Sequence, residues 1–211
     1  MARVSIESMD LDTWLIYLLA ATGLSLSPGP NGLLALTHGA LHGRRKALYT
    51  IFGGAFGFIA VIALSMFGIG ALLMTSLVWL TVMKWVGGAY LVWLGIEVWR
   101  SPPIGLETTG SAEPRSGGSL FRQGALSALT NPKALLFFTA FLPQFIDPVR
   151  SLAVQFVIMA GTFAVIEIAT EAVIAGMAHR INPWLGRVGR RFNQFCGGLF
   201  MAIGAALPLR G

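Results

Sequence analysis

Long apolar stretches are the feature that most limits what this chain can fold into. A helix needs about 20 mostly apolar residues to cross the roughly 30 Å hydrocarbon layer of a bilayer. The sequence therefore predicts an all-α integral membrane protein whose six transmembrane helices form one domain, residues 1–211. The six stretches run from about Thr13 to Thr37, Ala47 to Met74, Val78 to Trp99, Phe121 to Ile146, Leu152 to Ala178 and Phe192 to Leu209.

Composition supports this class and excludes others. Only 11% of the 211 residues are charged, whereas a soluble domain carries about 25%. The formal net charge of +6 does not indicate a nucleic-acid partner, because basic proteins of that kind are rich in polar residues, so we assign the bases to membrane faces. The single cysteine, Cys196, excludes an internal disulfide and a redox pair. The acidic segment before the first stretch is unlike a signal peptide.

The basic residues predict the orientation in the membrane. Ten lie in the connections between stretches one and two, three and four, and five and six, and three lie on the opposite side. The positive-inside rule makes the first side cytoplasmic and places both termini outside. The ten are Arg44, Arg45, Lys46, Arg100, Arg115, Arg122, Arg180, Arg187, Arg190 and Arg191, and the three are Arg3, Arg150 and Arg210.

Proline interrupts the first and fourth stretches at matching places. At a constant offset "LSLSPGPNGLL" aligns with "LSALTNPKALL", so that Pro30 aligns with Pro132. Proline breaks helices, because it lacks an N–H group and its ring clashes with the preceding turn. We therefore expect helices 1 and 4 to be broken, in a first repeat over about 12–100 and a second over about 120–211, joined by a linker at 101–119. With three helices in each half, the repeat is inverted.

Broken helices at corresponding positions of two halves indicate the binding site of a transporter. Pro30 suits the first position of a new half-helix, whose open N–H groups would attract a carboxylate. Lys133 follows the second break and would cost roughly 2.5–3.5 kcal/mol at the bilayer centre. It could pair with a substrate carboxylate or a protein acid. The alternatives are a packing kink and a lysine that snorkels to the surface. The candidate binding residues are Pro28, Gly29, Pro30, Asn31, Gly32, Asn131, Pro132 and Lys133.

Glu167 and Glu171 are four residues apart in the fifth stretch, hence on one helical face. Two neighbouring carboxylates inside a membrane cannot both ionise cheaply, so the pair could relay protons. It could also hold a substrate ammonium or pair with Lys133, or Glu171 could approach the headgroups. His38 and His42 are likewise four apart, but no third ligand is evident, so we expect no metal site and no cofactor.

Three segments resemble signatures of the LysE/RhtB superfamily of amino-acid exporters. "SPGPNGLLALTHGALHGRRKALYTIFGGAFG" is similar to its first-helix signature, "LTNPKALLFFTAFLPQFID" to its fourth and "GGAYLVWLGIEVWRS" to the end of its third helix. The resemblance implies a multi-pass protein of the bacterial cytoplasmic (inner) membrane. It also implies efflux of an amino acid or derivative by secondary transport driven by the proton gradient. Matching positions are Pro28 to Asn31 and Asn131 to Lys133.

Phe58 departs from the family pattern, because many relatives carry an acid there. Glu167 or Glu171 would then take over the coupling role of that acid. The superfamily also admits heavy-metal cation exporters, which is the alternative function. An intramembrane enzyme is disfavoured, because Ser27 and His38 are about 16 Å apart along a helix. The expected partners are an amino acid, protons and the lipid bilayer, with a homodimer left open; which amino acid is exported stays undecided.

Overall fold

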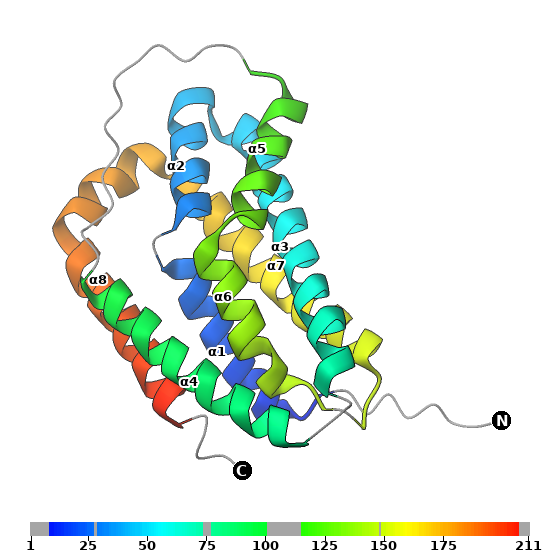
Figure 1. Cartoon of the computed structure of the whole chain (residues 1–211). Helices are drawn as coiled ribbons and strands as arrows, with labels where there is room; N and C mark the ends of the chain where they lie inside the picture. Colours follow the sequence, from blue (N-terminus) through cyan, green and yellow to red (C-terminus); the bar gives the residue numbers. More distant parts are fainter. Residues whose placement is uncertain (1–8, 28, 74–76, 101–114, 148, 207–211) are drawn as a thin grey trace.

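The computed structural model describes residues 9–27, 29–73, 77–100, 115–147 and 149–206, and their regular secondary structure is entirely helical (Figure 1). This confirms the all-α class. The elements in chain order are α1 (Leu11–Leu26), α2 (Pro30–His42), α3 (Arg44–Leu73), α4 (Leu77–Arg100), α5 (Gly117–Leu129), α6 (Pro132–Phe141), the short 3₁₀ helix η1 (Leu142–Phe145), α7 (Leu152–Gly176) and α8 (Ala178–Ala206).

Both predicted helix breaks are confirmed. One separates α1 from α2, which begins at Pro30, and the other separates α5 from α6, which begins at Pro132. The residue before a proline is pushed out of the helical region by the proline ring, and Gly29 and Asn131 accordingly have extended backbones. The axes of α5 and the segment after its break differ by 51°.

The long apolar helices support the prediction that the chain crosses the membrane several times. Among the described residues, two helices are long and apolar enough to span a bilayer, namely α3 over Arg44–Gly68 and α7 over Leu152–Gly176. Taken together as one broken span, the bent pair of α5 and α6 is also long and apolar enough to cross a bilayer. Helix α1 is apolar but shorter. Six spans and an inverted repeat remain predictions.

Several helices begin earlier than the predicted apolar stretches. The sixth stretch was predicted from about Phe192, whereas α8 begins at Ala178 and only Met177 separates it from α7. The connection before Phe192 contains four arginines, which favour helices, and its basic and apolar residues suit a helix at the membrane surface. Similarly, α3 begins at Arg44, and α5 begins at Gly117, inside the predicted linker. The linker residues 101–114 lie outside the described part.

Close backbone contact joins the helices in pairs. A Cβ atom on Gly124 of α5 would collide with the carbonyl oxygen of Thr50 on α3, and one on Gly53 with that of Phe121. In the same way Gly95 of α4 and Gly197 of α8 face each other's backbone. Small residues permit this approach between membrane helices. The pair α3–α5 thus attaches the second broken helix to α3, and α4–α8 is a second, separate pair (Figure 1).

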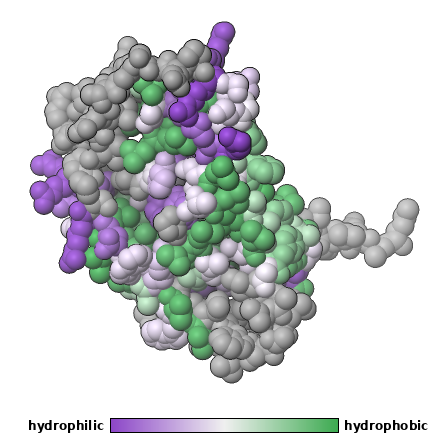
Figure 2. Space-filling view, turned by 45° about the horizontal axis from the view of Figure 1, so that its top comes forward, coloured by the Kyte–Doolittle hydropathy of each residue, from purple (hydrophilic) through white to green (hydrophobic). Residues whose placement is uncertain are grey.

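Aromatic side chains fill the core on one side of the breaks. Phe137, Phe138 and Phe141 of α6 are fully buried, and Phe163 of α7 packs edge-on against Phe138 at 5.0 Å between ring centroids. The outer surface is also apolar: exposed side chains include Leu19, Phe56 and Val165. Figure 2 shows hydrophobic residues across much of the visible face, with hydrophilic ones gathered toward its upper and left margins. Such a surface suits contact with lipid.

Candidate functional site

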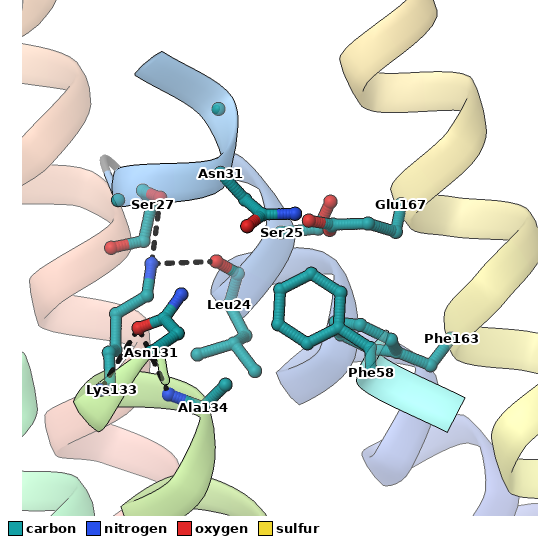
Figure 3. Close-up of a pocket in the computed structure, with 12 residues that line it drawn as sticks. Leu24, Ser25, Ser27, Asn31, Phe58, Asn131, Lys133, Ala134, Phe163 and Glu167 are labelled. Atoms are coloured by element: carbon teal, nitrogen blue, oxygen red, sulfur yellow. Dashed lines mark hydrogen bonds between the residues drawn. The ribbon is translucent and has the colours of Figure 1, made fainter. Parts of the chain in front are cut away.

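The two helix breaks meet at a pocket that α3 and α7 close from the sides (Figure 3). Its volume of about 20 Å³ holds roughly one water molecule, so the site is closed around its polar groups in this conformation. The lining residues are Leu24, Ser25, Ser27, Gly29, Asn31, Gly32, Phe58, Asn131, Lys133, Ala134, Phe163 and Glu167.

Lys133 connects the two breaks. Its Nζ donates hydrogen bonds to the carbonyl oxygens of Ser27 at 2.9 Å and Leu24 at 3.2 Å (Figure 3). These carbonyls belong to the last turn of α1, where the helix dipole is negative. Gly29 leaves the space for the ammonium, because a Cβ atom there would lie 3.0 Å from Nζ. The side chain therefore points into the protein rather than snorkelling to a surface.

The N-termini of the two half-helices differ. At α6 the side-chain oxygen of Asn131 accepts hydrogen bonds from the backbone N–H groups of Lys133 at 3.1 Å and Ala134 at 3.4 Å. At α2 the equivalent cap residue is Gly29, and no side chain caps that helix. The first N–H groups of α2 therefore stay open toward the break, whereas those of α6 are already satisfied.

Buried polar atoms without partners gather around this open end. The hydroxyls of Ser25 and Ser27, both amide atoms of Asn31, Oε2 of Glu167 and both carboxylate oxygens of Glu171 make no hydrogen bond within the described part of the chain. Each such group costs about 1–3 kcal/mol when buried unsatisfied. Ser25, Asn31 and the two glutamates are close enough to act on one another, so they form one buried polar cluster whose hydrogen bonding is incomplete.

Both acids predicted from the fifth stretch are buried. Glu167 is 4% exposed and lines the pocket, and Glu171 is 2% exposed, so it does not reach a surface. Glu171 lies one turn further along α7, near Gly54 of α3: a Cβ atom on Gly54 would lie 3.6 Å from its Oε2 and would collide with the Asn31 amide. Asn31 therefore lies between the pocket and Glu171.

An apolar wall of the pocket was not predicted from the sequence. Phe58 of α3 and Phe163 of α7 pack edge-on, with ring centroids 5.3 Å apart, and face the polar groups across the pocket (Figure 3). In the sequence, Phe58 differs from the family pattern, but nothing there indicates that it lines a pocket. Apolar residues are so frequent in these helices that no local signal distinguishes a pocket phenylalanine from one that faces lipid.

The remaining predicted residues are placed as follows. Pro28 lies outside the described residues, and Pro132 is the first residue of α6. His38 and His42 lie at the far end of α2 with ring centroids 5.5 Å apart. Within the described residues no three or more His, Cys, Asp or Glu side chains cluster as a metal site would require.

The amino-acid sequence is similar to one protein family and to several bacterial membrane proteins. The profile of the LysE type translocator family matches residues 22–211. An uncharacterized membrane protein of Vibrio cholerae is 37% identical over 94% of this chain and 98% of its own length. The homoserine/homoserine lactone efflux protein of Salmonella typhimurium is 38% identical over 94% of this chain and 97% of its own length. The leucine efflux protein of an Enterobacter species is 30% identical over 93% of this chain and 95% of its own length. No solved structure matches the chain.

Proposed function

Because the chain belongs to the LysE type translocator family, whose members are transporters rather than enzymes, we propose that it is a secondary-active efflux permease. Its cargo is a neutral amino acid or amino-acid derivative, exported from the cytoplasm in exchange for protons. The observation that carries this proposal is the pocket at the two helix breaks, which offers groups of opposite charge at its two sides. A small zwitterion needs such an arrangement.

The carboxylate of the substrate binds at the open N-terminus of α2. There the N–H groups of Asn31 and Gly32 are not capped by a side chain, and a helix N-terminus attracts anions. The ammonium group of Lys133 lies beside Gly29 and gives up its carbonyl partners for the stronger charge of a carboxylate. The N-terminus of α6, already capped by Asn131, is not available in the same way.

The ammonium of the substrate binds at Glu167. This carboxylate faces the pocket and has an unpartnered oxygen, with the amide of Asn31 beside it (Figure 3). The side chain of the substrate then meets Phe58, Phe163 and Leu24. Because a buried cation needs a partner and this wall offers none, an uncharged side chain fits best. Homoserine and leucine, named in two relatives, both have uncharged side chains.

Competition for Glu167 couples export to protons. A carboxylate can hold a proton or a substrate ammonium, but not both, so substrate binding and protonation exclude each other at this site. Glu171, one turn away and equally buried, accepts a proton because two adjacent buried carboxylates cannot both carry charge. Protons that enter from outside thus displace the substrate outward, while the two halves alternate between outward and inward access.

A heavy-metal cation exporter is the weaker candidate. Transition metals need three or more His, Cys or carboxylate ligands in one place, and no such group exists among the residues that the structure describes. The relatives with assigned transport carry amino-acid names. No observation specific to this chain favours a metal substrate.

The test follows efflux from bacterial cells loaded with labelled homoserine, leucine or lysine. We expect faster efflux of the neutral substrates when the protein is produced. Lys133→Ala and Glu167→Gln each remove a buried charged partner worth about 1.5–3 kcal/mol, so efflux falls about tenfold or more. The controls are Lys46→Ala and Asp12→Asn, which remove a positive and a negative charge from exposed positions. Wild-type efflux from the two pocket variants, at normal protein levels, would contradict the site.

A further inference from the structure

His38 is a buried titratable side chain that the proposed transport cycle does not yet use. It lies in α2 and is 4% exposed, and its Nδ1 shares a hydrogen bond of 2.7 Å with the hydroxyl of Thr50 on α3, itself 1% exposed. This bond fixes the imidazole ring and assigns Nδ1 to Thr50, which leaves Nε2 as the nitrogen that exchanges a proton.

Two helices, α7 and α3, lead from the pocket toward His38 in steps of one turn. On α7, Glu167 lines the pocket and Glu171 follows four residues later. On α3, Phe58 lines the pocket, Gly54 lies beside Glu171, and Thr50 follows next. Residues four apart share a helix face and are about 6 Å apart along the axis. The acid pair and His38 therefore lie on one line toward the end of α2.

A thin apolar layer separates Glu171 from His38. Ala35 and Ile51 lie between the two levels, and Ala47 and Ala175 of the same buried cluster lie level with His38 or beyond it. At this level α2 and α7 approach so closely that a Cβ atom on Gly39 would collide with the backbone of Ala175. For a proton to cross, one or two waters must bridge this short apolar stretch, which requires α2 to move away from α7.

We propose that His38, positioned by Thr50, passes the transported proton between Glu171 and the cytoplasm. This inference rests on the proposed function. The Glu171 carboxyl gives its proton through bridging water to Nε2, which leaves a carboxylate and an imidazolium. The imidazolium then releases the proton to cytoplasmic water, and the carboxylate accepts the next proton from the pocket side. No electrons move, and each step conserves charge.

The surroundings of His38 favour release of that proton. His42 follows one turn later on α2, and Arg115, which precedes α5, is also near enough to act on His38. Lys46 of α3 lies close to His42 in turn. Burial is the main cause that disfavours an imidazolium at His38, and the positive charge of Arg115 adds to it, whereas the described residues of α7 at this level, Ala175 and Gly176, are uncharged. A proton that reaches His38 is therefore passed on rather than kept.

The experiment uses the purified full-length protein in liposomes and labelled homoserine. Two rates are measured: exchange of internal for external homoserine at equal pH, and accumulation driven by an imposed pH gradient. Exchange needs no net proton movement, whereas accumulation does. For His38→Gln, which keeps a polar partner for Thr50 but cannot carry a proton, we expect accumulation to fall at least about tenfold and exchange to stay within about twofold.

The matched control is His42→Gln, which changes the less buried histidine one turn away and, unlike His38→Gln, should leave most of the gradient-driven accumulation in place. Thr50→Val should lower gradient-driven accumulation less than His38→Gln and shift its pH profile, because the ring remains but loses its anchor. Equal loss of both rates in His38→Gln would mean a structural role and overturn the proposal, as would two unchanged rates. If the wild-type protein exchanges homoserine but does not accumulate it in response to the pH gradient, the proposed proton coupling is wrong. If the wild-type protein does not transport homoserine at all, the proposed substrate class is wrong.

Discussion

At the scale of single residues, two asparagines illustrate how similar sequence positions acquire different roles. Asn131 uses its side-chain oxygen to cap α6, whereas both amide atoms of Asn31 are buried without a partner in the described residues. Asn31 follows the proline of its break and Asn131 precedes the proline of its own. One asparagine therefore stabilises the helix end, and we propose that the other binds the substrate.

This difference predicts opposite effects of two substitutions. Asn131→Ala removes an N-cap and should cost about 1 kcal/mol, which lowers the melting temperature of the detergent-solubilised protein. Asn31→Ala removes polar atoms that make no hydrogen bond, so it should not lower the melting temperature, but it should abolish most homoserine efflux. Ser116→Ala, which removes the cap of α5 away from the pocket, controls for capping alone. A stability loss for Asn31→Ala larger than that for Asn131→Ala would contradict this assignment.

At the scale of helices, backbone contact between α3 and α5 holds one wall of the site in place. Gly124 of α5 faces the Thr50 carbonyl so closely that even a methyl group does not fit. The same turn of α3 carries the Thr50 hydroxyl that binds His38. Packing of α5 therefore positions the side of α3 that faces the broken helices.

Gly124→Ala should consequently destabilise the protein. Overpacking costs about 1–3 kcal/mol, and each kcal/mol corresponds to roughly 2–4 °C in melting temperature at this chain length. Gly118→Ala is the matched control in the same helix, because a Cβ atom there meets nothing within 4 Å. It should leave the melting temperature unchanged or slightly higher, since alanine favours helices over glycine. Equal melting temperatures for the two variants would refute the close contact.

At the scale of the molecule, the connections between the helices lie at two opposite ends of the bundle. The turn between α2 and α3 and the start of α5 lie at one end, and the start of α1 and the connection from η1 to α7 lie at the other (Figure 1). At that second end Arg150 forms an ion pair of 2.8 Å with Asp10. The first end carries Arg44, Arg45 and Lys46, which should make it cytoplasmic.

Labelling of single cysteines checks this topology. In a Cys196→Ala background, Val149→Cys, whose parent side chain is 92% exposed, should react with a membrane-impermeant maleimide in intact cells. Arg45→Cys should react only after the membrane is permeabilised, because the positive-inside rule places it in the cytoplasm. The reverse pattern would invert the orientation, and reaction of both in intact cells would disprove passage of the chain across the membrane between them. A homodimer remains a prediction that this labelling does not address.

Local sequence alone was sufficient for the helical class, the two helix breaks and the buried acids. Proline and glycine act on their own and neighbouring dihedral angles, and a spacing of four residues defines a helix face wherever the helix lies. These inferences need no knowledge of distant contacts. The same local character explains why α8 begins earlier than its predicted apolar stretch, because hydropathy marks the apolar part of a helix and not where the helix starts.

Only the tertiary structure decided which groups meet. Lys133 reaches the carbonyls of Leu24 and Ser27 across more than a hundred residues of sequence, and Phe58 and Phe163 form one wall from two helices. Thr50 likewise finds His38 on another helix. Such contacts depend on the rotation of each helix about its axis, and that rotation is set by the packing of all the helices together. A uniformly apolar helix carries little local information about it.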